Sequence, residues 1–274
     1  MKISACLVIH NEEKYLPRCL LSIKEIVDEI ILIHDGECID KSLEIAKNYG
    51  ARIYIRQFVG EAEYHRPFSY QKANGDWILQ IDADEFLNAS AKNKIRRLIE
   101  KNNIDAYSFW WPYSNKNKYV KNGPFFQTFK PCLFRKKKMY MLGIAHEYPR
   151  TYGRLIKVKD IHLEHLFDED KYSEDSFKKK WKIWAKIQAE QIIHLDSAPI
   201  YNIANLSTIS IYSYYDFMRK HPIISGFLDL VKYFCICITR GIFWSGFYSW
   251  KIAWFETRYL LLVRKYLLEK THEK

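Results

Sequence analysis

Cysteine is scarce in this chain of 274 residues, and none of its six cysteines belongs to a C-x-x-C pair. Their irregular spacing disfavours both a disulfide framework and a cysteine-based zinc site. The sequence therefore predicts a reducing, cytoplasmic setting. The short apolar run Ile3–Ile9 ends in the polar residues 10–13, so we expect it to form a core strand and not the apolar segment of a secretion signal.

No run of apolar residues reaches the length of a membrane span. The region 222–268 is rich in aromatic and aliphatic residues, but Lys232 and Arg240 interrupt it before the ~20 residues that a spanning helix requires. We therefore expect this region to lie on a bilayer rather than to cross it.

The helix-like stretch 250–270 supports this expectation with two neighbouring stripes of side chains. The basic stripe is Lys251, Arg258 and Lys265, and the apolar stripe is Phe247, Trp254, Leu261 and Leu268. A spacing of seven residues places each set on one face of a helix. This pairing suits an anionic lipid surface, with the aromatic rings at the level of the headgroups.

Acidic residues are outnumbered, and the imbalance lies in one part of the chain. The formal net charge is +11; residues 1–100 carry 14 basic and 16 acidic side chains, whereas residues 101–274 carry 29 and 16. An anionic partner is therefore expected to meet the C-terminal part. The basic run 135–138 is also compatible with nucleic-acid binding. We interpret it as a solvated turn or a rim that faces phosphate, and expect no nucleic-acid partner.

The first 81 residues alternate between short strand-like and helix-like stretches. The strand-like stretches are Ile3–Ile9, Glu29–Ile33, Ala51–Ile55 and Trp77–Ile81, and the helix-like ones are Glu13–Glu25, Ile39–Tyr49 and Glu61–Asn74. Such alternation predicts right-handed crossovers, a mostly parallel central sheet and an α/β fold. Further strands are expected at Ala106–Trp111, Gln127–Phe134 and Ile161–His165, and a charged helix at Asp168–Gln191.

Polar clusters with acidic members follow three of these strands, at residues 10–13, 34–37 and 82–85. The carboxyl ends of parallel strands meet at one edge of the sheet, where ligands bind. Asp82 and Asp84 flank one alanine directly after an apolar strand. Two carboxylates in this position can hold one hard divalent cation and, through it, a diphosphate.

The order of these motifs resembles the nucleotide-sugar half of family 2 glycosyltransferases with the GT-A fold. The resemblance rests on Asn11-Glu12-Glu13, on the segment 27–31 leading to Asp35-Gly36, and on the segment 73–85. It covers residues 1–90 most strongly and is closest to the bacterial group that builds lipopolysaccharide cores and lipid-linked glycans. It implies a Rossmann-like sheet and a nucleotide diphosphate sugar as the donor.

The resemblance also implies donor-binding roles for four residues. Asp35 is expected to accept hydrogen bonds from the base or ribose, and Glu12 to lie near the ribose. Arg66 matches a basic residue near the base and diphosphate, and Asp82 is expected at the ribose or a metal-bound water. The structural alternatives are that Glu12 caps the following helix and that Arg66 is a solvated surface charge.

By the same resemblance Asp84 contacts the cation directly, and a histidine from a later strand completes the metal shell. His165 stands at the end of a predicted strand, and His162 is the nearby alternative. An imidazole ligand suits Mn²⁺, whereas carboxylate and water alone suit Mg²⁺. The expected metal ligands are therefore Asp82, Asp84 and His165.

An inverting transfer requires a carboxylate that takes the proton from the acceptor hydroxyl. The resemblance makes Glu147 the candidate catalytic base, with His146 orienting it or touching the acceptor. The structural alternative is an ion pair of Glu147 with Arg150 or Arg154.

Together these features predict a metal-dependent, inverting glycosyltransferase. It would move a hexose from a nucleotide diphosphate sugar, a UDP-sugar being favoured, to a lipid-linked glycan or lipopolysaccharide-type acceptor. The expected domains are a catalytic domain at 1–220, with a nucleotide-sugar half at 1–100 and an acceptor half at 101–220, and a membrane-associating helical tail at 221–274. The expected location is the inner face of the cell membrane.

In the acceptor half the segment 110–113 offers aromatic rings that either stack on a sugar or belong to the core.

Two rival functions remain. A nucleotidyltransferase would need a glycine-rich basic loop after the first strand, and residues 10–18 contain no glycine. A non-catalytic membrane- or RNA-binding module on a degenerate GT-A fold would not need the intact acidic residues. The tail is alternatively a packed lid or an oligomer interface, and the oligomeric state stays open.

Overall fold

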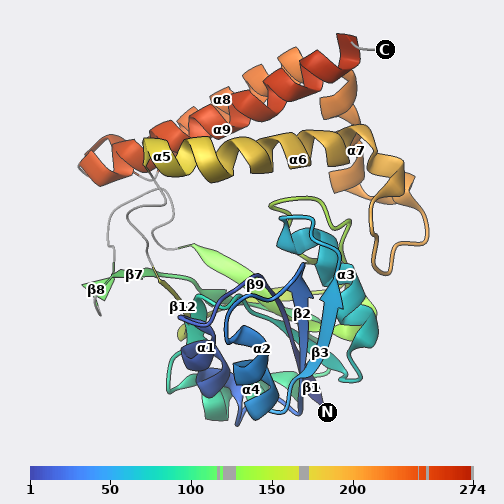
Figure 1. The fold of residues 1–274 in the computed structure, drawn as a ribbon, viewed down its shortest axis with the longest axis vertical. Coiled ribbons are helices and arrows are strands. Elements are labelled where there is room, and N and C mark those ends of the chain that lie inside the picture. The colour runs from blue at the N-terminus through green and yellow to red at the C-terminus, as the bar shows by residue number, and fades with distance from the viewer. Residues whose placement is uncertain (116–117, 120–127, 167–172, 240, 245–246, 273–274) are drawn as a thin grey trace. The chain divides into compact units, whose positions relative to one another are not determined.

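The structure, a computed structural model, describes residues 1–115, 118–119, 128–166, 173–239, 241–244 and 247–272. The chain divides into two compact units (Figure 1). The first unit comprises residues 1–114, 127–166 and 199–203, and the second comprises 115–126, 167–198 and 204–274.

The first unit is built on a mixed, mostly parallel sheet with the strand order β3-β2-β1-β4-β9-β6-β12-β7. Its strands are β1 (Ile3–Ile9), β2 (Glu29–Asp35), β3 (Arg52–Arg56), β4 (Trp77–Gln80), β5 (Glu85–Leu87), β6 (Ala106–Trp110), β7 (Tyr113–Asn115), β9 (Phe129–Arg135) and β12 (Leu155–Leu166). Strand β9 runs antiparallel between β4 and β6, and β5 pairs antiparallel with β12. The remaining short strands are β8 (Lys118–Tyr119), β10 (Met139–Tyr140) and β11 (Arg150–Thr151), of which β10 and β11 pair with each other.

Helices cover both faces of this sheet, which explains why β1 is buried along its whole length. The helices are α1 (Leu16–Ile23), α2 (Ser42–Asn48), α3 (Ala62–Lys72) and α4 (Ala91–Ile99). Ile3 and Leu7 of β1 lie in a core cluster with residues of α1 and α4. Cys6 and Val8 point to the opposite face and share a cluster with Tyr70 of α3. The alternation of β1 therefore serves two cores at once.

The predicted α/β class with a mostly parallel sheet is confirmed, and the four early strands lie where the sequence placed them. Strand β12 begins six residues earlier than the predicted strand at 161–165 because a register shift between Val158 and His162 lets it pair along β6. The predicted strand at 127–134 begins one residue outside the described part of the chain. Strand β5 and helix α4 were not predicted.

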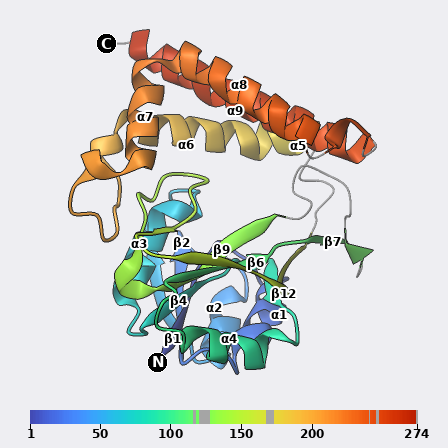
Figure 2. The same ribbon diagram turned by 180° about the vertical axis from the view of Figure 1, so that it is seen from behind.

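Apart from the short strand β8, the second unit is mainly helical within its described residues (Figure 2). Its helices are α5 (Glu174–Ser176), a π-helical turn (Phe177–Trp181), α6 (Lys182–Ile193), α7 (Ser210–Lys220), α8 (Pro222–Thr239) and α9 (Phe247–His272). Helices α6 and α8 both pack on α9. The predicted helix at 168–191 begins outside the described residues, which resume at 173.

The unit boundary differs from the predicted domain boundary at 220. Trp181 packs edge-to-face on Tyr259 at 5.8 Å between ring centroids, and the Tyr259 hydroxyl donates a hydrogen bond of 3.1 Å to Gln188. These contacts tie the helices before residue 198 to α9. The segment predicted as part of the acceptor half therefore groups with the C-terminal helices instead.

The two predicted stripes of α9 differ in exposure. The apolar residues Phe247, Trp254 and Leu261 are exposed, as the amphipathic pattern predicts. In the basic stripe, Arg258 forms an ion pair with Glu174 and lies 4.0 Å from the centroid of the Phe177 ring. Arg258 is therefore engaged inside the second unit, and the basic stripe is not a continuous free face.

Helix α8 is long and apolar enough to cross a membrane by length and composition, with a mean hydropathy of 1.6 over its 18 residues. Core helices of soluble proteins pass the same test, but only 17% of this stretch is buried. Of the two charged residues expected to interrupt the region, Lys232 lies inside α8 and Arg240 follows its end, so α8 reaches 18 residues with Lys232 within it.

Candidate active site

The candidate site is centred on Asp82, which follows the buried strand β4. Arg66 Nη2 lies 2.8 Å from Asp82 Oδ1, and Lys130 Nζ lies 2.6 Å from Asp82 Oδ2. Burial alone would raise the pKa of Asp82, but the charges of Arg66 and Lys130 outweigh it and hold the pKa well below its usual range. Asp82 is therefore a carboxylate between two buried cations, one from α3 and one from β9.

Glu85, the first residue of β5, shares Lys130 with Asp82. Lys130 Nζ lies 2.7 Å from Glu85 Oε1, and Trp111 Nε1 donates a hydrogen bond of 2.6 Å to the same oxygen. Glu85 Oε2 accepts a hydrogen bond of 3.0 Å from the backbone N–H of Asp82. Burial raises the pKa of Glu85 despite the opposing charge of Lys130. The turn at residues 82–85 is therefore held by the hydrogen bond between Glu85 and the Asp82 backbone and by the shared ion pairs with Lys130.

Lys130 was not predicted as a site residue, although the sequence carries a signal for it. Strand β9 places Lys130 on the same side as Cys132 and Phe134, which are both fully buried. A lysine at such a position needs an internal carboxylate partner, because burying an unpaired charge is costly. The partners lie more than forty residues away in sequence, so the pattern predicts their existence but not their identity.

Asp84 and His165 form the second part of the site. His165 Nε2 lies 2.9 Å from Asp84 Oδ2, and the His165 ring stacks on Trp111 at 4.8 Å with an interplanar angle of 9°. The backbone N–H of Leu166 donates a hydrogen bond of 3.1 Å to the Asp84 carbonyl. The alternative ligand His162 packs edge-to-face on Trp110. The structure therefore brings together Asp84 and His165, the predicted pair.

The Asp84–His165 pair offers a cation one carboxylate oxygen and one imidazole nitrogen, a donor set that suits Mn²⁺. Asp84 is accessible, with 40% of its side chain exposed. Among the described residues, no group of three or more His, Cys, Asp or Glu side chains is arranged to hold a metal ion. Asp82, the third predicted ligand, faces Arg66 and Lys130 in this structure. Two protein ligands fit a cation whose other positions are taken by phosphate oxygens and water.

The carboxylate of Asp35, at the end of β2, accepts hydrogen bonds from other residues of the protein. The donors are the backbone N–H groups of Val59 (2.7 Å) and Gly60 (2.8 Å) and His65 Nε2 (2.8 Å). Arg56 Nη1 donates to His65 Nδ1 at 3.1 Å, so Nε2 carries the proton that His65 donates to Asp35. Burial raises the pKa of Asp35, but these hydrogen bonds outweigh it and lower the pKa overall. Asp35 thus anchors the 59–60 loop, a role the sequence did not predict.

Glu12 lies at the turn that opens α1. Its carbonyl accepts hydrogen bonds from the backbone N–H groups of Tyr15 and Leu16, and its own N–H donates to Ser42 Oγ at 2.7 Å. The preceding residue, Asn11, adopts a positive φ of 55° and accepts a hydrogen bond from the Ile39 N–H. The loops that follow β1 and β2 are therefore joined, which places Glu12 at the predicted edge of the sheet.

Glu147 lies in a tight loop after β10 and is 3% exposed. Its Oε2 accepts hydrogen bonds from the backbone N–H groups of Leu142 (3.0 Å) and Gly143 (2.9 Å), while its buried Oε1 has no hydrogen-bond partner among the described residues. Burial raises the pKa of Glu147 to about 7, against the charge of Arg150 and the backbone hydrogen bonds. The neighbouring His146 is exposed and has a φ of 62°.

The Glu147 loop packs against the helix that carries Arg66. A Cβ placed on Gly143 would lie 3.0 Å from Pro67 Cγ and 3.2 Å from the Glu63 carbonyl oxygen, so a side chain here would push against α3. Gly143 also has a φ of 78°, which favours glycine. The loop and the Asp82 centre are therefore both tied to α3.

The sequence profile described as "Glycosyl transferase family 2" matches residues 4–160, more than half of the chain. The chain belongs to this family. The glycosyl transferase family 2 region thus contains every predicted site residue except His162 and His165, which follow it directly.

Curated relatives agree with this assignment. An uncharacterized glycosyltransferase of Rickettsia typhi is 34% identical over 106 residues, which cover 39% of this chain and 36% of that protein. The glycosyltransferase SunS of Bacillus subtilis is 26% identical over 156 residues, covering 55% of this chain and 35% of that protein. The matched stretch spans about a third of the length of each relative.

Solved structures similar to this chain include S. aureus TarS 1-349 in complex with UDP-GlcNAc, with a TM-score of 0.48 and 16% identity over 79% of this chain and 73% of that chain. GalNAc-T7 with UDP, GalNAc and Mn2+ gives a TM-score of 0.49 and 15% identity over 68% of this chain and 47% of that chain. The family assignment and the mostly parallel sheet with C-terminal helices agree with the expected GT-A fold class.

Proposed function

We propose that the protein is a metal-dependent, inverting glycosyltransferase that moves a hexose from a nucleotide diphosphate sugar, a UDP-sugar being favoured, to a lipid-linked glycan acceptor. One observation carries the proposal. Two buried cations, Arg66 and Lys130, meet at Asp82 beside the Asp84–His165 pair. In a family 2 glycosyltransferase domain this edge of the sheet is where a nucleotide diphosphate sugar is expected.

Arg66 is the residue that we assign to the donor diphosphate. It is 4% exposed, and its Nε and Nη1 have no hydrogen-bond partner among the described residues. Buried N–H donors without acceptors are costly, and phosphate oxygens are strong acceptors for a guanidinium. Asp82 and Glu63 hold the guanidinium in place through Nη2, which leaves the other nitrogens for a ligand.

Asp84 and His165 are the residues that would hold a divalent cation. When bound, the cation would neutralise charge on the leaving diphosphate. The His165 ring stacks on the Trp111 indole, and the Trp111 Nε1–H donates a hydrogen bond to Glu85. These two contacts fix the orientation of the indole and, through stacking, that of the imidazole. Asp82 and Glu12 complete the proposed donor site on the ribose side.

Glu147 is the proposed catalytic base, with His146 on the acceptor side. A general base works best when its pKa lies near the working pH, and burial brings the Glu147 pKa to about 7. The backbone hydrogen bonds to Oε2 fix the carboxylate and leave Oε1 for the acceptor hydroxyl.

The second unit supports the proposed lipid-linked acceptor and the proposed peripheral location on the inner face of the cell membrane. Helix α9 exposes Trp250 and Trp254. Helix α8 exposes large apolar side chains along its length, namely Ile223, Ile224, Phe227, Leu228, Val231, Phe234 and Ile238. Exposed apolar surfaces of this extent mark interaction sites, and tryptophan is typical of the membrane interface.

The decisive experiment measures donor binding and transfer together. Thermal shifts are recorded with UDP-, GDP- and dTDP-sugars, each with and without Mn²⁺, since a ligand that binds only the folded state raises the melting temperature. The variant Asp84→Asn should lose the Mn²⁺-dependent shift and sugar transfer. The matched control Asp160→Asn, an exposed aspartate paired only loosely with Lys94, should keep both. Absence of any nucleotide-sugar shift in the wild type would contradict the proposal.

A further inference from the structure

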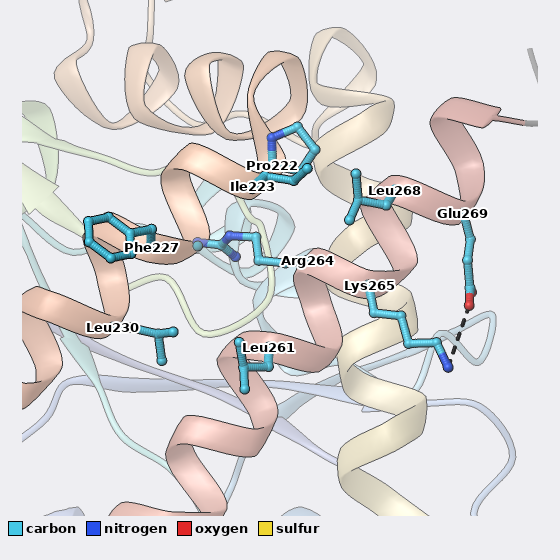
Figure 3. A pocket seen from close by; sticks show the side chains of 10 residues that line it. Pro222, Ile223, Phe227, Leu230, Leu261, Arg264, Lys265, Leu268 and Glu269 are labelled. Carbon is cyan, nitrogen blue, oxygen red and sulfur yellow. Dashed lines mark ion pairs between the residues drawn. The ribbon is translucent and has the colours of Figure 1, made fainter.

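A pocket of about 500 Å³ lies between α8 and α9 in the second unit (Figure 3). Its walls are mainly apolar, formed by Ile223, Phe227 and Leu230 of α8 and Leu261 and Leu268 of α9, with Arg264 among them. Pockets of this volume, with apolar walls and one or two polar groups, are typical of sites for small molecules.

Arg264 is the polar group in this pocket, and it is 6% exposed. Its Nη2 forms an ion pair with Asp229 and lies 3.4 Å from the Tyr214 hydroxyl, which itself donates to Asp229. Its Nε has no hydrogen-bond partner among the described residues. The Arg264 side chain extends from α9 toward α8, where Gly226 leaves room for its stem (Figure 3).

These features define the chemistry of a ligand. The polar group without a partner is an N–H donor, so the ligand must present an acceptor oxygen. Lys265, largely exposed, adds a second positive charge to the lining, which Glu269, also in the lining, offsets in part from 3.6 Å (Figure 3). The walls require a hydrocarbon chain, because they offer few other polar contacts to a ligand. A lipid phosphate satisfies all three requirements.

We propose that the α8–α9 pocket binds one lipid phosphate, with its hydrocarbon chain along the apolar walls and a phosphate oxygen accepting from Arg264. The lining residues Ile223 and Phe227 are 71% and 66% exposed and continue into the apolar surface of α8. The pocket therefore opens onto a surface suited to hydrocarbon, from which a lipid can enter. The inference concerns the second unit alone and does not depend on the proposed transfer reaction.

The test uses the full chain without a nucleotide sugar. Three ligands are compared, and the two with a dodecyl chain are kept at concentrations where they do not self-associate. Dodecyl phosphate, dodecanol and inorganic phosphate are titrated by calorimetry. Dodecyl phosphate should bind at least about tenfold more tightly than dodecanol, since a hydrogen bond to a charged group contributes that much or more. Inorganic phosphate should not bind measurably. Equal affinity for dodecyl phosphate and dodecanol overturns the headgroup assignment, and absence of binding by both overturns the pocket.

Variants then locate the site. Leu261→Glu places a carboxylate in the wall at an exposed position and should weaken dodecyl phosphate binding at least about tenfold through desolvation and repulsion. Ile183→Glu changes a similarly exposed residue of α6 outside the pocket and should leave binding unchanged. Equal loss in both variants contradicts the proposal.

The headgroup contact needs a variant that leaves no unpaired buried charge. Arg264→Gln combined with Asp229→Asn removes both members of the ion pair. This double variant should bind dodecyl phosphate and dodecanol alike. Retained preference for the phosphate would overturn the role of Arg264. A dimer seen by sedimentation that dodecyl phosphate fails to dissociate would show that a second copy fills the pocket, which also contradicts the proposal.

Discussion

Lys130 Nζ lies 2.6 Å from Asp82 Oδ2 and 2.7 Å from Glu85 Oε1, so one buried ammonium group serves two carboxylates. Their mutual repulsion is offset by this lysine and, at Asp82, by Arg66. The turn at residues 82–85 therefore depends on a side chain from β9, an antiparallel strand that joins the sheet late in the chain.

Replacing this lysine should destabilise the fold. Lys130→Met leaves the buried Glu85 carboxylate and the partly exposed Asp82 carboxylate without their shared partner, and breaking a buried ion pair typically costs about 3–5 kcal/mol of the free energy of unfolding. Urea unfolding measures the loss. Lys137→Met, at an exposed position of the neighbouring turn, should change stability by less than about 0.5 kcal/mol. Equal stability of the two variants would show that Lys130 does not hold the cluster.

The activity should depend on pH through Glu147. Only the ionised carboxylate accepts a proton, so kcat/KM should rise with pH up to about 7, the pKa of this group, and level off above it. Glu147→Gln cannot accept the proton, and turnover should fall by about 10²–10⁴-fold with donor affinity little changed. A collapse of donor affinity would place Glu147 in the nucleotide site instead.

The same group should make stability depend on pH. Its folded pKa of about 7 lies above the ordinary value of 4.5, so between these values the folded state holds a proton that the unfolded state has released. Stability contributed by protonated Glu147 is therefore lost as pH rises through this window. Glu147→Gln does not titrate, so its free energy of unfolding relative to the wild type should increase from about pH 5 to about pH 8. A pH-independent difference would contradict the raised pKa.

Asp35 should act mainly on stability. Asp35→Asn disturbs hydrogen bonds to Val59, Gly60 and His65 and should cost about 1–3 kcal/mol at neutral pH. Because the folded pKa of Asp35 is lowered, its contribution is present above the ordinary value of 3.8 and is lost as pH falls through the folded pKa. The difference in the free energy of unfolding between Asp35→Asn and the wild type should therefore shrink as pH falls through the folded pKa of Asp35.

A control and a donor titration complete this test. Asp76→Asn alters an exposed aspartate that accepts one hydrogen bond from the Lys2 backbone, and it should change stability little. If Asp35→Asn instead lowered donor affinity without a loss of stability, direct recognition of the base by Asp35 would replace the anchoring role.

Membrane binding should depend on the exposed apolar side chains more than on the basic stripe. The full chain is expected to sediment with anionic liposomes. Phe234→Glu and Trp254→Glu should each weaken binding at least about tenfold, because burying such a side chain contributes about 1.5–3 kcal/mol. Ile183→Glu serves as the control on α6. Raised salt should weaken binding only in part, since Arg258 is already paired with Glu174.

A different result would reassign this surface. If the wild type did not sediment with liposomes at low salt, the apolar face would be covered by a second copy of the chain, and analytical ultracentrifugation would show the oligomer. The acceptor would then have no reason to be a lipid.

The sequence by itself determined the strands β1 to β4 and the position of Asp82 and Asp84 at an edge of the sheet. These features are local: a buried strand needs a short apolar run, and the polar residues that follow it are placed by the end of that strand. The pairing of Asp84 with His165 could also be predicted, because the resemblance to family 2 glycosyltransferases implies a histidine ligand from a later strand.

Only the tertiary structure decided which charges meet. Lys130 reaches Asp82 because β9 inserts antiparallel between β4 and β6, and no local pattern specifies that strand order. His65 reaches Asp35 because α3 packs beside β2, and the helices before residue 198 join α9 through aromatic contacts. Such partners are separated by tens of residues, so their meeting depends on the free energy of packing the whole fold and not on the sequence around either one.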